Sequence, residues 1–224
     1  RTSSCVIAPI VSGDSVLGVL NLADKYDLSN FEKQTDLPAL ELLCEIIGAA
    51  LYNIQLYREV NHKAQTDGMT NLLNHTTFYK VLKRELKRFE RYGSKLALLM
   101  IDLDGLKKIN DGHGHLAGDM VIKHVAHCIR KCIRQTDIAA RYGGDEFAVI
   151  LPETQLAAAE TIADRLLEEV GNNLVNFKNE KIQATISIGV GESVKGQTIE
   201  QFVDNIDTAL FTAKENGKNR RIVT

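Results

Sequence analysis

Two acidic segments of this sequence have the residue types and spacing to bind metal ions. The first is IDLDGLKKINDGHGHLAGD, residues 101–119, in which Asp102 ends a near-continuous apolar run that we predict to be a buried strand. Asp102 and Asp104 are two residues apart, so their side chains share one face for as long as the strand lasts. Carboxylates at a strand end can hold Mg²⁺, which prefers one or two carboxylates together with phosphate oxygens.

The second segment is RYGGDEF, residues 141–147, in which a tight Gly-Gly turn carries two adjacent acids, Asp145 and Glu146. Glycines let the backbone approach a ligand closely. If this hairpin lies beside the strand that ends at Asp102, three or four carboxylates converge, and they repel one another unless cations are present. Two metal ions could then support phosphoryl transfer. The alternative is a solvated acidic turn, which composition alone would favour.

The elements that position these acids follow from the hydrophobic periodicity. We predict helices at 76–92, 117–134, 155–170 and 199–216, and strands at 95–103, 138–142, 146–151, 182–190 and 219–223. From residue 76 the order is αβαββαβα, followed by the last strand. This order predicts an α/β (α+β) domain with a central mixed sheet flanked by helices, as in palm-like domains.

The composition narrows the classes of function. Hydrophobic residues make up 44% and charged residues 25% of the 224 residues, so we expect a soluble chain of one or two domains. The formal net charge of −2 argues against a general nucleic-acid binder, which would show a basic excess. No apolar run reaches the roughly 18 residues of a membrane span. The chain starts with Arg1 rather than Met, so we expect a fragment or a processed form.

The four cysteines are Cys5, Cys44, Cys128 and Cys132. They are too few and too scattered for a secreted disulfide framework, so a reducing cytosol is expected. His124, Cys128 and Cys132 follow one another at intervals of four and could share a helix face. A zinc site there would need a fourth ligand, and none is evident. The alternative is two buried thiols beside a solvated histidine.

The first 66 residues follow a different pattern. Apolar runs at 5–11 and 16–22 flank a Ser-Gly-Asp turn signal and predict a short strand pair. A long helix follows at about 37–64. Six of its residues have the 3-4-3-4-3 spacing of a coiled-coil seam: Leu40, Leu43, Ile47, Ala50, Ile54 and Tyr57. We predict that this helix mediates dimer contact; the alternative is an ordinary amphipathic core helix.

Five motifs resemble, in order, those of the GGDEF family of bacterial diguanylate cyclases. Besides RYGGDEF, they are DGMTNLLN (67–74), DLDGLKKIND (102–111), GHLAGD (114–119) and AKENGKNR (213–220). The resemblance covers 67–224 and implies a palm-like nucleotidyl cyclase fold. It also implies that a homodimer, with one GTP bound to each domain, condenses two GTP into cyclic di-GMP and releases two pyrophosphates. The implied location is the bacterial cytoplasm.

The same resemblance implies a role for each of nine residues in catalysis or binding. They are the metal ligands Asp102, Asp145 and the backbone of Leu103, the acid Glu146 near the 3′-hydroxyl or a metal, the guanine readers Asn110 and Asp119, the phosphate contacts Lys214 and Lys218, and Lys107 as a further stabiliser of the transition state. The implied cofactor is Mg²⁺ (or Mn²⁺), two per active site. An amide and a carboxylate together can pair with the donors and acceptors of guanine, and such polar pairing discriminates strongly between substrates.

A further motif points to regulation by the product. Arg134-Gln-Thr-Asp137 matches RxxD and ends shortly before Gly143. In the GGDEF family this spacing marks the inhibitory site that binds cyclic di-GMP, and an arginine fork suits its phosphates. Arg165 stands where a secondary arginine of that site often lies; the alternative for Arg165 is a solvated helix charge.

Several positions depart from the family pattern or carry no assigned role. His75 follows the opening motif where arginine is usual, and Lys218 replaces an arginine, which keeps the charge but loses the bidentate fork. His113 and His115 are expected in a loop. The N-terminal piece resembles the C-terminal end of a GAF sensor domain, for which no ligand can be named. The predicted division is 1–36 for truncated GAF-like strands, 37–66 for a signalling helix and 67–224 for the GGDEF domain.

Three functions fit these residues. The first is an active, product-inhibited diguanylate cyclase. The second is a catalytically weak or inactive GGDEF domain that acts as a receptor for cyclic di-GMP or GTP, which the intact acids disfavour. The third is a structural dimer module that binds no nucleotide.

Overall fold

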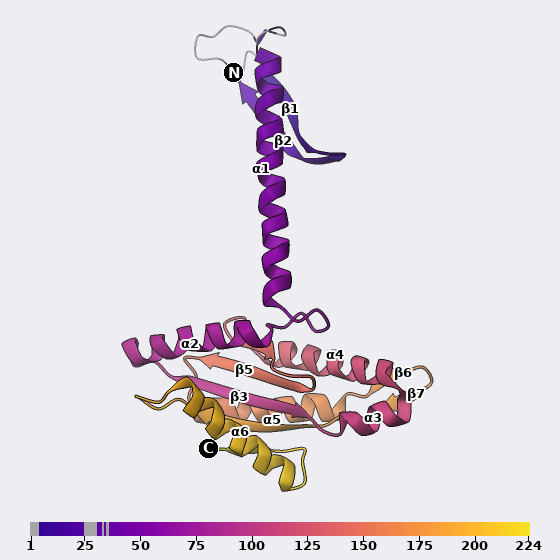
Figure 1. Ribbon diagram of the computed structural model, residues 1–224, viewed down its shortest axis with the longest axis vertical. Coiled ribbons are helices and arrows are strands. Elements are labelled where there is room, and N and C mark those ends of the chain that lie inside the picture. Colours follow the sequence, from indigo (N-terminus) through magenta and orange to yellow (C-terminus); the bar gives the residue numbers. More distant parts are fainter. Residues whose placement is uncertain (1–4, 25–30, 33, 35) are drawn as a thin grey trace. The chain divides into compact units, whose positions relative to one another are not determined.

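The computed structural model describes residues 5–24, 31–32, 34 and 36–224 (Figure 1). The chain forms two compact units, Arg1–Ala64 and Gln65–Thr224. In the first unit an antiparallel hairpin accompanies a long helix. Its elements are β1 (Cys5–Ser12), β2 (Ser15–Ala23) and α1 (Asp36–Gln65).

One face of α1 packs against the hairpin. Leu40, Cys44 and Gly48 are the buried residues of α1, and their spacing of four places them on the same face. A Cβ at Gly48 would overlap the carbonyl of Val11, so the helix and β1 are in backbone contact. The hairpin therefore covers Leu40 of the predicted seam, whereas the Tyr57 side chain is 70% exposed.

The second unit is built on a five-stranded mixed sheet in the order β4-β5-β3-β8-β9. All its neighbouring strands are antiparallel except β8 and β9, which are parallel. The elements are α2 (His75–Tyr92), β3 (Leu96–Leu103), α3 (Leu106–His113), α4 (His115–Cys132), β4 (Ile138–Arg141), β5 (Glu146–Pro152), α5 (Leu156–Asn172), β6 (Val175–Phe177), β7 (Glu180–Ile182), β8 (Ile186–Glu192), α6 (Ile199–Glu215) and β9 (Arg221–Val223). The central mixed sheet and its flanking helices confirm the predicted fold class.

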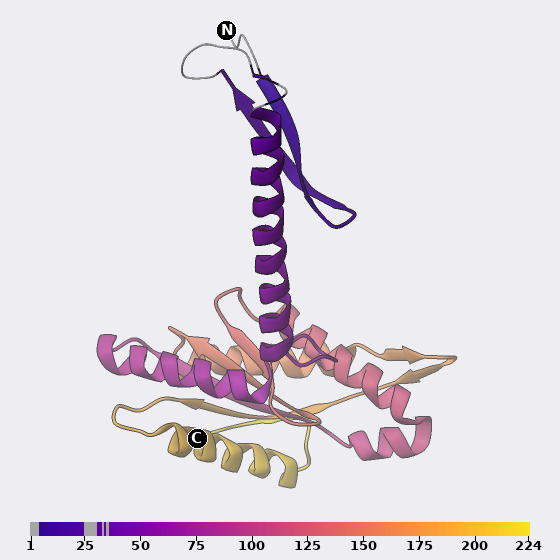
Figure 2. The ribbon, with the colours of Figure 1, turned by 45° about the horizontal axis from the view of Figure 1, so that its top comes forward.

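The side chains of β3 alternate between two cores because successive residues of a strand point to opposite faces. Ala97, Leu99 and Ile101 pack with residues of α4 and α5. Leu98 and Met100 pack with residues of α2 and α6 on the other face. The sheet thus lies between two helical layers (Figure 2). The next side chain on the α2/α6 face is Asp102, which brings the acidic group to the end of that layer.

Two local expectations were wrong. The segment between β3 and α4 contains helix α3, so His113 and His115 lie at helix ends rather than in a loop. Two glycines with positive φ, Gly105 at 72° and Gly114 at 86°, cap this short helix on either side. His113 pairs with Glu180 at 2.6 Å. The strand expected at 182–190 is β8, and a separate hairpin, β6–β7, precedes it.

The two cysteines of α4 were candidates for a zinc site in the sequence. Cys128 and Cys132 are buried free thiols, and burial raises the pKa of Cys128 to about 11. Within the described part of the chain, no group of three or more His, Cys, Asp or Glu side chains could hold a metal ion, which argues against the zinc site.

Among the described helices, α1 is the one long and apolar enough to cross a membrane, with a mean hydropathy of 1.5 over 18 residues.

Candidate active site

The two acidic segments lie side by side at the end of β3. Asp102 is paired in register with Glu146 at the start of β5. The backbone N–H of Leu103 donates to the carbonyl of Asp145 at 3.0 Å, which fixes the Gly-Gly turn beside the strand end. The sheet register therefore brings together three of the predicted site acids, which are Asp102, Asp145 and Glu146.

Asp102 is a desolvated carboxylate that has two acidic neighbours and one ion pair. The pKa of Asp102 is raised to about 6, mainly by burial and also by the negative charges of Asp145 and Glu146. The ion pair with Lys214 lowers the pKa, but by less than burial raises it. Lys214 Nζ lies 2.7 Å from Asp102 Oδ2. Desolvation and like charges disfavour the ionised carboxylate, so an additional cation near these acids would stabilise it.

One acid of this cluster is absent from the sequence prediction. Asp207 on α6 has a raised pKa, caused by desolvation and by the charges of Glu146 and Asp204. Lys214 lies on the same helix, seven residues further on. The signal that could have identified Asp207 was this spacing of two helical turns, which places both side chains on one side of α6.

Asp104 lies just beyond the strand end and is hydrogen-bonded to residues distant in the sequence. Strand β3 ends at Leu103, so the alternation of side chains does not extend to Asp104. Its carboxylate accepts hydrogen bonds from the hydroxyls of Thr185 and Ser187, at 2.9 and 2.8 Å, and from the backbone N–H of Asn219 at 3.1 Å. Asp104 thus ties the loop that follows α6 to the end of the sheet.

A hollow of about 430 Å³ lies beside this loop. Its lining residues are Asp104, Gly105, Lys108, Ile109, Gln183, Thr185 and Lys218. Two lysines and the N-terminal end of α3 therefore border one space, and such a combination favours anions. Lys107, the predicted stabiliser, is exposed on α3 and is not among these lining residues.

Asn110 has an unsatisfied buried acceptor. Its Oδ1 atom is buried and has no hydrogen-bond partner within the described residues. Gly118 on α4 lies so close that a Cβ there would overlap Asn110 Oδ1. Asp119 follows on the same helix and is half-buried. Because buried polar atoms are nearly always paired, the free acceptor is consistent with a ligand that donates a hydrogen bond.

The Gly-Gly turn is anchored by the opening motif. Arg141 donates from Nη1 to the carboxylate of Asp67 at 3.1 Å, and from Nη2 to the carbonyl of Gly144 at 2.6 Å. The hydroxyls of Tyr142 and Tyr79 lie 2.8 Å apart. The ring centroids of His75 and Tyr142 lie 4.8 Å apart. His75, which stands where the family usually has arginine, therefore makes an aromatic contact beside the turn.

The RxxD motif lies away from these acids, at a different hollow. Asp137 accepts a hydrogen bond from the backbone N–H of Arg134 at 2.8 Å. Arg134 lines a hollow of about 460 Å³ together with Arg84 and Arg88 of α2. Arg165 does not line it, and donates instead to the carbonyl of Cys132. The arginines that join Arg134 are therefore on α2, a pairing that sequence spacing could not reveal.

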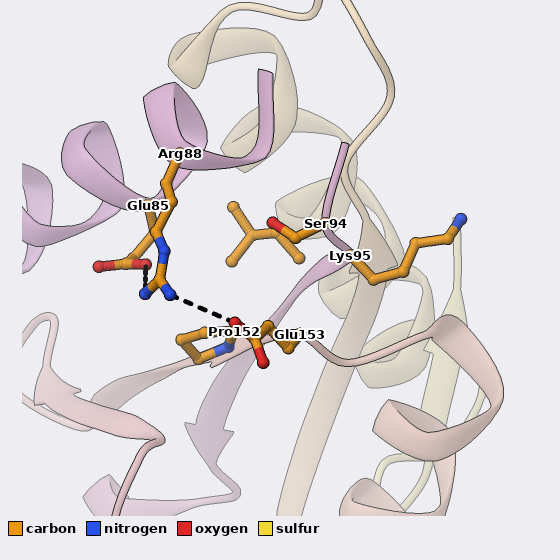
Figure 3. A pocket seen from close by; sticks show the side chains of 7 residues that line it. Glu85, Arg88, Ser94, Lys95, Pro152 and Glu153 are labelled. Carbon is orange, nitrogen blue, oxygen red and sulfur yellow. Dashed lines mark hydrogen bonds and ion pairs between the residues drawn. The ribbon is translucent and has the colours of Figure 1, made fainter. Parts of the chain in front are cut away.

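Acidic side chains balance the arginines of α2. Figure 3 shows Arg88 between Glu85 and Glu153, in a smaller pocket that adjoins the hollow of Arg134. Arg88 lies 3.7 Å from the carboxylate of Glu85 and 3.3 Å from that of Glu153. A ligand phosphate would compete with these carboxylates for the guanidinium group.

The donor set at the end of β3 suits a hard divalent cation. Although Asp102, Asp145 and Glu146 lie at the same strand end, no group of three or more His, Cys, Asp or Glu side chains among the described residues could hold a metal ion by itself, so an ion at Asp102 and Asp145 would need oxygens from elsewhere. Mg²⁺ binds in this way, through one or two carboxylates and substrate phosphates. The residues present therefore fit Mg²⁺ together with a phosphate-bearing ligand.

Comparisons with known proteins agree with these features. Residues 64–220 match the family model described as "Diguanylate cyclase, GGDEF domain". Diguanylate cyclase A of Treponema denticola is 35% identical over 97% of this chain, and diguanylate cyclase DgcP of Pseudomonas aeruginosa is 33% identical over 91%. The chain spans 59% and 31% of the lengths of these two relatives. The family match does not reach the first 63 residues, so their likeness to a GAF domain stays a prediction.

A solved structure has the same fold. The coiled coil and GGDEF domain of DgcB from Caulobacter crescentus, in complex with c-di-GMP, aligns with a TM-score of 0.76 and 30% sequence identity. The alignment covers 83% of this chain and all of that one.

Proposed function

Because this chain belongs to the GGDEF family of diguanylate cyclases, we propose that it condenses two GTP into cyclic di-GMP with release of two pyrophosphates. The observation that carries the proposal is the pairing of Asp102 with Glu146 across β3 and β5, beside Asp145 and Lys214. This arrangement provides carboxylates for a cation and an ammonium group for a phosphate in one place.

Asp102 and Asp145, with the backbone of Leu103, would hold two Mg²⁺ (or Mn²⁺). Bound cations would lower the pKa of the 3′-hydroxyl and offset charge on the α-phosphate. Glu146, half-buried beside Asp102, would accept the proton from the 3′-hydroxyl oxygen.

Charged and polar side chains of this chain would orient the nucleotide. Lys214 and Lys218 would contact the terminal phosphates, and Lys108 lines the same hollow as Lys218. Preorganised cations of this kind stabilise the charge that develops during transfer. Asn110 and Asp119 would pair with guanine, and the free buried acceptor of Asn110 supports this role.

Two copies of the chain would act together, because each domain would bind one GTP and the product contains two guanylyl units. The reaction would thus need a homodimer in which two sites face each other. GTP is a cytoplasmic nucleotide, so we place the domain in the bacterial cytoplasm.

The full chain incubated with GTP and Mg²⁺ should release cyclic di-GMP, identified by mass, with a rate that rises faster than linearly with protein concentration. ATP in place of GTP should give no cyclic product. GTP binding without product at any protein concentration would contradict the cyclase and favour the receptor function. Absence of nucleotide binding in calorimetry would contradict both.

We further propose product inhibition through Arg134 and Asp137, supported by the hollow that Arg134 shares with Arg84 and Arg88. Arg134→Ala should raise the cyclic di-GMP concentration for half-inhibition at least about tenfold, because a charge-assisted hydrogen bond contributes about 1.5–3 kcal/mol.

The matched variants Arg88→Ala and Arg165→Ala locate the rest of the inhibitory site. We expect Arg88→Ala to weaken inhibition, because Arg88 lines the hollow. Arg165→Ala should change the half-inhibition concentration less than about twofold, because Arg165 bonds to Cys132 outside the hollow. Unchanged inhibition in Arg134→Ala would contradict the proposed inhibitory site without affecting the proposed cyclase activity.

A further inference from the structure

The outward face of α2 is densely basic. Helix α2 contains six lysines and arginines and two glutamates, a formal charge of +4, whereas the whole chain has a formal charge of −2. The residues outside α2 therefore have a combined charge of −6. Positive charge is thus concentrated on one helix of a chain that is otherwise acidic.

Four of these cations lie in a row along the helix, here called the Lys87 stripe. They are Lys80, Lys83, Lys87 and Arg91, and all four are exposed. At 3.6 residues per turn they fall within an arc of roughly 80° and extend over roughly 16 Å of the helix. Phe78 and Leu82 are fully buried and lie on the opposite side, so the stripe faces away from the sheet.

Neighbouring acids do not neutralise the stripe. Arg84 and Arg88, the other two cations of α2, form ion pairs with Glu85, and Arg88 also pairs with Glu153. Within the part of the chain that the structure describes, the four cations of the stripe form no such pair. Glu90 lies at one margin of the arc. A row of unneutralised cations on a rigid helix complements an extended anionic surface.

The side chains of the stripe suit a flat anionic surface better than a nucleic acid. Besides the four cations, this described arc contains Thr76 and no amide or aromatic side chain. Proteins read base edges with amides and stack bases on aromatic rings. The charged ends of long Lys and Arg stems can all reach one plane, whereas a duplex curves away from a straight helix.

We propose that the Lys87 stripe docks this domain on the anionic headgroups of a phospholipid bilayer. Clusters of about four to eight Lys and Arg on one helix are typical of such binding. The contact is peripheral, because the apolar face of α2 stays packed on the sheet and no segment needs to enter the hydrocarbon. The inference goes beyond the proposed function and does not depend on it.

Docking through the stripe leaves the acidic site accessible. The ring of His75, at the start of α2, contacts Tyr142 beside the Gly-Gly turn. Arg88, near the end of the helix, contacts Glu153 just beyond the other end of β5. The stripe therefore runs from the end of the sheet that holds the acidic site toward the opposite end, and it faces outward along the whole distance.

Co-sedimentation of the full chain with large unilamellar vesicles tests the stripe. The probe vesicles contain phosphatidylglycerol and phosphatidylcholine in equal parts, and the neutral vesicles contain phosphatidylcholine alone. The chain should bind the anionic vesicles and not the neutral ones. Raising the salt concentration from about 0.1 M to about 1 M should weaken binding at least about tenfold, because salt screens exposed charges.

The triple variant Lys80→Gln, Lys83→Gln, Lys87→Gln removes three charges and keeps good helix formers in α2. It should bind the anionic vesicles at least about 50-fold more weakly, because each lysine near an anionic surface contributes about fivefold in affinity. The single variant Lys87→Gln should already weaken binding about fivefold. Unchanged far-UV circular dichroism checks that the helices are retained.

The matched control is Lys178→Gln, Lys181→Gln, Lys195→Gln, which removes the same charge from exposed lysines outside α2. It should change vesicle binding less than about threefold, because charges beyond a Debye length of roughly 10 Å act weakly. Equal loss of binding in both triple variants would overturn the proposal, since net charge rather than the stripe would then govern binding.

Two further outcomes would also overturn it. One is equal binding to neutral and anionic vesicles, or no binding to either at low salt. The other is tighter binding of the full chain to a DNA or RNA duplex than to the anionic vesicles, with that binding lost in the α2 triple variant, since the stripe would then be a nucleic-acid surface.

Discussion

Asp102→Asn should lower the rate of cyclic di-GMP formation at least about 1000-fold. The substitution keeps the shape of the side chain but removes the charge that, with Asp145, would hold the cations. Metal-ion catalysis supplies several kcal/mol of transition-state stabilisation, and each 1.36 kcal/mol corresponds to a factor of ten in rate. The measurement is kcat with GTP and saturating Mg²⁺, with the product quantified by mass.

The fold should survive this change. Asp102 is desolvated beside two other carboxylates, and its raised pKa shows that its charge is unfavourable in the free protein. We therefore expect the thermal midpoint of Asp102→Asn to lie within a few degrees of the original. Glu90→Gln removes one negative charge from the exposed surface of α2 and should change kcat less than about twofold. Retention of a tenth or more of the activity by folded Asp102→Asn would contradict the assigned role.

The layout of the acidic site could be predicted where it depends on local rules. An apolar run of strand length ended at Asp102, and a Gly-Gly turn preceded Asp145. Both features are visible in a single sequence because strand burial and turn chemistry are local. The resemblance to the GGDEF family then supplied the pairing between the two segments.

The remaining features depend on tertiary geometry. The carboxylate of Asp104 accepts hydrogen bonds from Thr185 and Ser187, more than eighty residues away, and its spacing from Asp102 could not identify these partners. The proximity of Arg88 to the hollow of Arg134 arises from the packing of α2 beside β4 and β5. Periodicity along one helix cannot reveal such contacts, because it shows which face of the helix is apolar but not which element packs against that face.

The predicted seam of α1 illustrates the same limit. Its heptad spacing is visible in the sequence, but the spacing does not show which element covers each residue. The backbone contact between Gly48 and Val11 shows that the hairpin occupies one side of the helix, where Leu40 is buried.

Gly118→Ala should raise the KM for GTP about 10- to 100-fold while the protein remains folded. The added Cβ would occupy the position of Asn110 Oδ1, so the amide would turn away from its place. Loss of a hydrogen bond between a buried polar group and its ligand costs about 1–3 kcal/mol, which corresponds to this range of affinity. The displaced atoms are the end of a flexible side chain, and alanine is a better helix former than glycine by about 1 kcal/mol, so stability should be maintained.

Gly171→Ala provides the matched control. Gly171 is also helical, but a Cβ there would meet no atom within 4 Å, so this variant should gain the same helix propensity and keep its KM. A double variant separates the amide from the glycine. If Gly118→Ala acts by displacing Asn110, then it should add little to the KM increase of Asn110→Ala, because the two changes remove one interaction. Additive effects of the two substitutions, or an unchanged KM in Gly118→Ala, would instead show that the unpaired acceptor of Asn110 does not read the base, and Asp119 would then be the remaining candidate.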